Sequence, residues 1–516
     1  MLKVATLTAI MFNLGILIYF AAIATVWDEE SHTFYLSRLP LSNLLDLMFH
    51  NFDQDAPAFN VLLHVWQKVV YQNHFLLRLM PLIFWVATMA GVGFLANRLA
   101  GRTAMFWALI MTSLWPYHWI YPISMRWYSL AAALGVWNLY FFVRLMESRR
   151  PNVNIKPYFP LLFGALVAVT GAALWYTVYI APAIAAGELV LLLVVADSSM
   201  REGRAWAVAW LGAVILYLPW LPTFLGQLRE TAGYRLTFDH IASSSYVVWA
   251  GDFSLPTTFW ISLPFLAAFI VSLLLALKHW SMSRTPLLVG GVVFFSLLLV
   301  DAIEIERLLL VTVFLSTGIG ISVAAALKDR DRRMIRNVVI VAGILALVGF
   351  GGSFANITST SGWFTYRWLD DVEQAADHVE SNYPGTLILS NSNSLAFYVD
   401  DPTGLELARY RFDNNLALAS ETKVWNTLLR SDADYGLLMK QAISSHADVT
   451  YVHHAFFNAS GSSQQIESVL TWLSALGFEP IDRWQSTPIK GGNERFLNLQ
   501  DHPSYRITLV NLRNSR

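Results

Sequence analysis

Long apolar stretches alternate with short polar ones along most of the chain. A helix needs about 20 mostly apolar residues to cross roughly 30 Å of hydrocarbon. About eleven such stretches precede residue 356, near 5–26, 79–97, 103–118, 127–143, 158–178, 181–196, 206–221, 259–277, 286–301, 307–327 and 337–355. The pattern therefore predicts an α-helical, polytopic membrane protein with about eleven transmembrane helices.

After residue 356 the pattern changes. "RWLDDVEQAADHVESNY" has the spacing of an amphipathic helix, and "GTLILS" is typical of a short buried strand. The same order recurs in "YGLLMKQAISSHADVTYVHHA" and in "SSQQIESVLTWLSALGFEPIDRW". This alternation predicts a small α/β domain over 357–516, which follows a membrane domain over 1–356.

Composition agrees with a membrane protein, since 55% of the residues are hydrophobic and only 14% are charged. The chain has no cysteine, which excludes disulfides and thiolate metal sites. The first apolar run lacks a convincing small-residue cleavage site, so we expect a retained span. We expect membrane lipids around the spans and no nucleic-acid partner.

Lysine and arginine predict the orientation. With the N-terminus inside, sixteen of the basic residues before residue 356 fall on the inner side and seven on the outer side. The outer side then holds an outer loop at 27–78 with amphipathic helices, another at 222–258, and the C-terminal domain. We therefore expect a multi-pass protein of the cell membrane, in bacteria the inner membrane, with a cytoplasmic N-terminus and an extracytoplasmic C-terminal domain.

Several polar clusters meet on this outer side although they lie far apart in the sequence. They are the acidic triplet Asp28, Glu29 and Glu30, the pair Asp53 and Asp55, the turn at Arg126, and "DAIEIERLLL" with Arg307. A site assembled from several outer loops is the natural hypothesis.

The motifs of the first outer loop follow a recognisable order. "WDEESHTFYLSR" is followed by "DQDAPAFNVLLHVWQKVV", then by "HFLLRLMPLIFWV" and "YPISMRWYSL". This succession resembles the family-39-like membrane glycosyltransferases of the GT-C superfamily, which include protein O-mannosyltransferases and lipid A aminoarabinose transferases. The matching positions are Asp28 and Glu29, Pro57 with His64 and Trp66, Arg78, Arg126 with Tyr128, and Arg307.

The chain departs from the family pattern at three places. Asp55-Ala56-Pro57 stands where the family usually carries His-Pro-Pro, Ile123-Ser124-Met125 stands before Arg126 where Gln-Glu-Ala is frequent, and Leu308 stands where tyrosine is common. The carboxylate of Asp55 could take over a polar role. These departures leave the substrate open.

The resemblance implies transfer of a sugar from a polyprenyl-phosphate donor to an acceptor on the outer face, by single displacement with inversion. A protein hydroxyl, lipid A, teichoic acid and a surface glycan are all compatible acceptors. Two alternatives stay open: a non-catalytic, lipid-binding scaffold of the same fold, and a flippase or transporter of lipid-linked sugars. Against transport, the chain has no internal repeat and few charges inside its spans.

The chemistry suggests a role for each polar residue. An acceptor hydroxyl that attacks an anomeric carbon benefits from a carboxylate base, for which we choose Asp28, with Glu29 orienting the acceptor. The leaving lipid phosphate needs positive charge, which Arg126 and Arg307 could supply as guanidinium forks, with Tyr128 beside them. As alternatives, Arg126 could be an interfacial anchor, and Arg307 could be ion-paired with nearby glutamates.

The remaining polar residues have competing interpretations. Asp53 fits a helix cap before Pro57, and Asp55 fits either that cap or the site. Both aspartates could also bind a divalent cation together with Asp28, although we assign no cofactor. His64 and Arg78 could contact the acceptor or shape the site, while His64 fits a buried interfacial helix equally well.

Two further acids have simpler expectations. Glu30 is expected to be a surface charge. Glu188, inside the span 181–196, is expected to form a hydrogen bond between helices.

Overall fold

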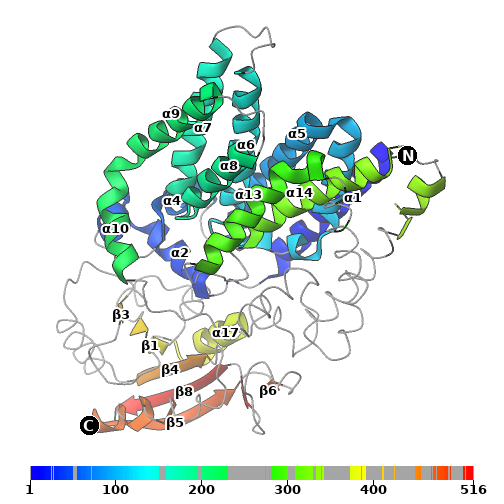
Figure 1. Ribbon diagram of the computed structural model, residues 1–516. Coiled ribbons are helices and arrows are strands. Elements are labelled where there is room, and N and C mark those ends of the chain that lie inside the picture. The colour runs from blue at the N-terminus through cyan, green and yellow to red at the C-terminus, as the bar shows by residue number, and fades with distance from the viewer. Residues whose placement is uncertain are drawn as a thin grey trace. The chain divides into compact units, whose positions relative to one another are not determined.

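The structure is a computed structural model, and it is mostly helical (Figure 1). It describes residues 2–24, 26, 28–49, 55–70, 73–119, 121–149, 158–194, 200–230, 274, 278, 280–299, 308–328, 333–338, 340–341, 344, 372–384, 386–390, 410–411, 423–424, 448–454, 466–467, 469–471, 473–485, 488–489, 504–505 and 507–514.

The chain forms two compact units. The first comprises Met1–Ala22, Ser37–Phe253 and Phe259–Ser353, and the second comprises Ile23–Leu36, Ser254–Thr258 and Phe354–Arg516. The predicted domain boundary at 356 lies outside the described residues, so the assignment of 1–356 and 357–516 stays a prediction.

Apolar helices make up the first unit. They are α1 (Leu2–Ile23), α3 (Leu41–Phe49), α4 (Pro57–Val70), α5 (His74–Leu114), α6 (Tyr128–Ser148), α7 (Tyr158–Trp175), α8 (Ala181–Val194), α9 (Met200–Tyr217), α10 (Leu221–Glu230), α13 (Trp280–Leu299) and α14 (Leu309–Ala326). α2 (Asp28–Arg38) belongs mostly to the second unit. Short 3-10 turns η1 (Pro116–Trp119), η2 (Tyr121–Ile123) and η3 (Leu218–Trp220) connect some of them.

Six helical stretches in the described part are long and apolar enough to cross a membrane: α1, α5, α6, α7, Met200–Gln227 and α14. This confirms a helical protein with several candidate spans. Two predicted spans, 259–277 and 337–355, lie largely outside the described residues. The total of eleven therefore stays a prediction.

α5 is a hairpin of two helical arms. Gly101 has non-helical angles, φ 83° and ψ −179°, which glycine adopts without the strain of a side chain. A Cβ on Gly93 would lie 3.5 Å from Leu109 and 3.6 Å from Met105. In a straight helix Gly93 and Leu109 would be about 24 Å apart, so the arms fold back on each other. They correspond to the predicted spans 79–97 and 103–118.

α14 lies at the centre of the first unit, packed against α5, α6 and α13. Its closest approach is to the second arm of α5. A Cβ on Gly320 would lie 2.3 Å from the Cα of Ala108 and 2.5 Å from its backbone nitrogen. Only a residue without a side chain lets the two backbones pack at this distance.

The outward faces of several helices carry exposed apolar side chains, among them Val4, Leu7 and Met11 of α1 and Val208 and Leu211 of α9. In water such surfaces would cause association, whereas hydrocarbon solvates them. The pattern fits helices that face lipid.

Glu188 of α8 is fully buried, and its Oε2 accepts a hydrogen bond from Trp210 Nε1 of α9 at 2.8 Å. The predicted hydrogen bond between helices is confirmed.

The second unit contains a four-stranded sheet with the strand order β1-β4-β8-β5. Its strands are β1 (Leu387–Ser390), β4 (Asp448–His454), β5 (Phe478–Gln485) and β8 (Ile507–Asn514). β1 pairs with β4 in parallel, and β8 pairs antiparallel with both β4 and β5. Two small antiparallel pairs are β2 (Tyr410–Arg411) with β3 (Lys423–Val424) and β6 (Pro488–Ile489) with β7 (Ser504–Tyr505).

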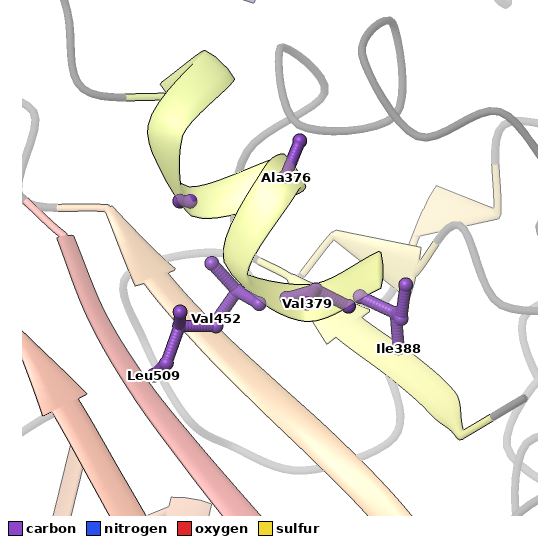
Figure 2. Packing of buried hydrophobic residues seen from close by; sticks show 6 residues of the cluster. Ala376, Val379, Ile388, Val452 and Leu509 are labelled. Carbon is purple, nitrogen blue, oxygen red and sulfur yellow. The ribbon is translucent and has the colours of Figure 1, made fainter. Parts of the chain in front are cut away.

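α17 (Val372–Asn382) covers one face of this sheet. Figure 2 shows Val379 of α17 beside Ile388 of β1, Val452 of β4 and Leu509 of β8. Together with Ala375 and Ala376 these side chains form a small apolar core. The location of the C-terminal domain outside the cell stays a prediction.

Tyr383, directly after α17, ties this helix to β5. Its hydroxyl donates a hydrogen bond to the carboxylate of Asp482, and His378 stacks on Trp484 of β5 at 4.9 Å between ring centroids. This hydrogen bond, together with the Arg483 backbone N–H, holds the pKa of Asp482 below its usual value. Burial, and secondly Asp482, raises the pKa of Tyr383 to about 12.

The Gly320 contact generates a test of the helix packing. Gly320→Ala should lower the melting temperature of the detergent-solubilised protein by several degrees, because overpacking against a backbone costs about 1–3 kcal/mol or more. Gly291→Ala on α13 is the matched control, since a Cβ there meets nothing within 4 Å. Equal melting temperatures for the two variants would contradict the close approach.

The Tyr383–Asp482 contact predicts a pH dependence. Because the pKa of Asp482 is lowered in the folded state, the contact stabilises at neutral pH, and its contribution disappears as the pH falls below about 4. Tyr383→Phe should therefore raise deuterium exchange of the β5 backbone amides at pH 7. After correction for intrinsic rates, exchange in this variant should change less with acidification than exchange in the wild type.

The control for this variant is Asp448→Asn, which removes an exposed ion pair with Arg513 at 3.1 Å between β4 and β8. Exposed pairs contribute little, so exchange should hardly change. Unaltered β5 exchange in Tyr383→Phe at pH 7 would rule out a stabilising role for the contact.

Candidate functional site

An ion pair joins two of the predicted site residues. Arg126 Nη1 lies 2.7 Å from Asp55 Oδ2, and Nη2 lies 3.4 Å from Oδ1. Asp55 precedes the first residue of α4, and Arg126 precedes the first turn of α6. The side chains are only 11% and 22% exposed, so the pair is largely withdrawn from water. Asp55 therefore contacts Arg126, another of the predicted site residues, and whether the pair belongs to a site stays a prediction.

The N-terminus of α6 follows Arg126 directly. Tyr128, the first residue of the helix, is buried, and Ser129 Oγ donates a hydrogen bond of 2.6 Å to the carbonyl of Pro122. A helix N-terminus presents backbone N–H groups and the positive end of the helix dipole. Arg126 and Tyr128 thus stand where an anion would be stabilised.

The two ends of α6 differ in their chemistry. At the far end Arg98 contacts Glu147 at 2.7 Å, and Arg144 contacts the same carboxylate at 3.5 Å. A helix of this length spans about 30 Å, so these two basic residues lie about one hydrocarbon thickness from Arg126. The sequence assigns Arg98 and Arg144 to one side of the membrane and Arg126 to the other, and this topology stays a prediction.

His64 fixes α4 in place. It is buried, and its Nδ1 donates to the carbonyl of Ser37 at 2.9 Å. Ser37 Oγ donates to Asn60 Oδ1 at 3.4 Å, and the backbone N–H of Ala58 donates to the carbonyl of Tyr176 at 2.8 Å. These contacts anchor the helix that follows Asp55, which favours the buried interpretation of His64 over acceptor contact.

Arg78 lies in the second turn of α5 and is fully buried. Asn73 caps this helix by accepting a hydrogen bond from the N–H of Leu76 at 2.9 Å. Trp66 Nε1 of α4 donates to the carbonyl of Leu76 at 2.9 Å. The position of Arg78 fits shaping of the α4–α5 junction.

Other predicted residues lie partly or wholly outside the described part. Asp28 and Glu29 are the first residues of α2, and their side chains are outside it. Asp53 and Arg307 lie outside it entirely, as do residues 231–258 of the second outer loop. Glu30 is fully buried, so its interpretation as a surface charge is wrong. The position of Glu30 in the sequence, close to the outer end of a predicted span, did not indicate that its side chain is buried.

An aromatic cluster in the first unit, at the end that holds Asp55 and Arg126, was not predicted from the sequence. Tyr179 donates to Gln227 of α10, Trp220 Nε1 donates to Tyr179 at 3.3 Å, and Phe49 of α3 packs on Trp220 at 4.5 Å. No sequence signal distinguishes it, because tyrosine and tryptophan are common in every membrane-interface region. The cluster joins α10, where the predicted second outer loop begins, to α3.

Within the described part, no group of three or more histidines, aspartates and glutamates is arranged to hold a metal ion. Asp55 is already neutralised by Arg126, and the side chains of Asp28 and Asp53 lie outside that part.

Comparison with known proteins finds similar solved structures, and these agree on one fold. No family model and no curated protein matches the chain. The chain is similar to ArnT from Cupriavidus metallidurans bound to undecaprenyl phosphate, with 11% identity, a TM-score of 0.55, and coverage of 98% of this chain and 97% of that one. The apo state of the same protein gives 12% identity, the same TM-score and the same coverage.

The archaeal oligosaccharyltransferase AglB from Archaeoglobus fulgidus, in complex with an inhibitory peptide and a dolichol-phosphate, is also similar. Its identity is 9%, its TM-score is 0.51, and the match covers 94% of this chain and 73% of that chain. Both neighbours are glycosyltransferases of the GT-C superfamily. The chain therefore has the fold of these two neighbours, in agreement with the resemblance stated from the motifs of the first outer loop, and its apolar helices support a multi-pass membrane protein.

Proposed function

We propose that the chain is a membrane glycosyltransferase that moves a sugar from a polyprenyl-phosphate donor to an acceptor on the outer face of the membrane. The observation that carries this proposal is Arg126, held by Asp55 at the N-terminus of α6. The fold adds support, because similar structures contain undecaprenyl phosphate or a dolichol-phosphate.

Arg126 is suited to a lipid phosphate for physical reasons. A guanidinium carries five N–H donors in a rigid fork, so an ion pair with one carboxylate is compatible with a second contact to an anion. Asp55 restricts the orientation of the fork, and the dipole of α6 adds positive potential. Tyr128, two residues on, completes this group, and Arg307 is proposed to contribute from the segment before α14.

The reaction is a single displacement. The acceptor oxygen forms a bond to the anomeric carbon, the bond from that carbon to the phosphate oxygen breaks, and the phosphate leaves with the electron pair. Asp28 takes the proton from the acceptor, and Glu29 orients the acceptor. Attack opposite the leaving phosphate inverts the anomeric centre. The arginines stabilise the charge that develops on the phosphate.

The remaining assignments complete the scheme. His64 and Arg78 shape the α4–α5 junction around the site, and no step uses a metal ion. A divalent cation bound by Asp28 and Asp53 stays a proposal, with Asp55 engaged by Arg126 instead. We place the N-terminus in the cytoplasm and the C-terminal domain outside it. A protein hydroxyl, lipid A, teichoic acid and a surface glycan remain the candidate acceptors.

The first test concerns Asp28. Asp28→Asn should reduce transfer from a labelled polyprenyl-phosphate sugar by about 10²–10⁴-fold, because an amide cannot accept the proton. Glu29→Gln should have a smaller effect, and Asp377→Asn, an exposed acid on α17, should have none. Transfer and hydrolysis of the labelled lipid are measured with purified protein in liposomes.

Other outcomes decide between function classes. Full transfer by Asp28→Asn would remove the base from the mechanism. Movement of the labelled lipid between leaflets without a covalent product would indicate a flippase. Binding of the lipid with neither transfer nor hydrolysis by the wild type would indicate a scaffold.

The second test concerns Arg126. Arg126→Lys keeps the charge but loses the fork, so the KM for the donor should rise about tenfold. Arg98→Lys is the matched control, since Arg98 also pairs with a carboxylate, that of Glu147, at the opposite end of the bundle. If both variants show the same KM, Arg126 does not bind the donor.

A further inference from the structure

The connection between α5 and α6 ends on Arg126, and it is buried although it is not an α-helix. Its described residues with an exposed fraction of 1% or less are Tyr117, His118, Trp119, Tyr121, Ile123, Ser124 and Met125. Backbone outside a helix is stable at such a position only where neighbouring groups satisfy its polar atoms. The partners of this connection therefore determine where Arg126 lies.

His118 is the centre of those partners. Its Nδ1 lies 2.8 Å from the carbonyl of Thr112, and its Nε2 lies 2.8 Å from Thr312 Oγ1 of α14. The imidazole packs edge-on against Trp85, with 5.0 Å between ring centroids, and stacks on Trp115 at 5.8 Å. The ring is thus fixed by a hydrogen bond at each nitrogen and by an aromatic ring on two sides.

The hydrogen bond at Nδ1 of His118 has a defined direction. A carbonyl only accepts, so Nδ1 donates to Thr112, and a neutral imidazole then presents a lone pair at Nε2. The hydroxyl of Thr312 has one hydrogen, which can serve Nε2 or the carbonyl of Leu309 at 2.9 Å. Donation to Nε2 pairs both ring nitrogens, so the Thr312 hydroxyl is the group that joins η1 to α14.

Further contacts hold the rest of the connection between α5 and α6 in place. Asn13 Nδ2 of α1 donates to the carbonyl of His118 at 3.1 Å. Tyr117 stacks on Tyr121 at 4.5 Å with an interplanar angle of 26°. The Ser124 N–H donates to the carbonyl of Tyr121 at 3.2 Å, two residues before Arg126.

We infer that His118, held by Thr312, is a positioning residue that sets the location of Arg126. This inference rests on the proposed function, because it assigns Arg126 to the donor phosphate. His118 touches neither substrate nor reacting atoms. It acts through the buried connection, which has a partner on α14 at one end and the ion pair with Asp55 at the other.

The test compares two threonines on α14. Thr312→Val removes the hydroxyl at nearly constant volume and releases His118 Nε2. Thr317→Val is the matched control: Thr317 is also fully buried, and its hydroxyl donates within the helix to Val313 at 2.7 Å. We expect Thr312→Val to raise the KM for the polyprenyl-phosphate sugar and the Kd for polyprenyl phosphate about tenfold, with kcat changed less than about twofold.

Two further variants separate positioning from loss of stability. Thr312→Ser keeps the hydroxyl and should restore the wild-type KM. Ser322→Ala breaks a buried hydrogen bond of 2.9 Å to the carbonyl of Gly318 within α14 that involves neither Thr112 nor η1, so it should lower the melting temperature without raising KM. If Thr312→Val does not fold, Thr312→Ala, which also removes the hydroxyl that holds His118 Nε2, should show the same rise in KM.

A double-mutant cycle identifies the residue through which the effect acts. In an Arg126→Ala background, Thr312→Val should raise the Kd for polyprenyl phosphate no further, because the positioned group is gone. The inference would be overturned if Thr312→Val raised the Kd by the same factor in the wild-type and Arg126→Ala backgrounds. Equal KM values for Thr312→Val and Thr317→Val would overturn it as well. A wild type that binds polyprenyl phosphate but transfers no sugar would contradict the proposed function and leave the binding comparison valid.

Discussion

The buried connection between α5 and α6 is the constraint on which the candidate site depends. An arginine cannot lie between apolar helices without a partner, and a non-helical backbone cannot pass through such a bundle without hydrogen bonds. The chain meets both conditions in one short segment, with His118 bonded to Thr312 and Arg126 paired with Asp55. The position of the guanidinium is therefore set by α14 and α4 as well as by α6.

Close packing of helices makes this arrangement rigid. α14 can reach His118 only because it lies directly against the second arm of α5, where Gly320 faces the backbone of Ala108. The hairpin at Gly101 places that arm so that its last residues lead into η1. A side chain at Gly320 would clash with the backbone of Ala108 and force α14 away from this arm. Helix packing and site geometry are thus linked through the same few positions.

Hydropathy predicted the six candidate spans that the described residues contain, because a membrane helix must be apolar over most of its length. The burial of Glu188 against a neighbouring helix followed from the cost of an acid in hydrocarbon. Sequence order also predicted Arg126 and Asp55 as site residues, but not that they touch. Their contact depends on how loops 71 residues apart fold back. His118 gave no signal, since a single histidine among aromatic residues is compatible with many environments. Glu30 was misjudged because burial depends on tertiary neighbours.

The energetics of the two ion pairs on α6 explain why one of them points to function. The pair of Arg98 with Glu147 involves an arginine that is 46% exposed, and such pairs contribute about 0–1 kcal/mol. The pair of Arg126 with Asp55 is far less exposed, so both groups lose hydration that their attraction only partly replaces. An apolar pair of similar volume would be as stable or more so. Stability alone therefore does not account for an arginine so largely withdrawn from water at this position, whereas the proposed anionic ligand at the N-terminus of α6 would.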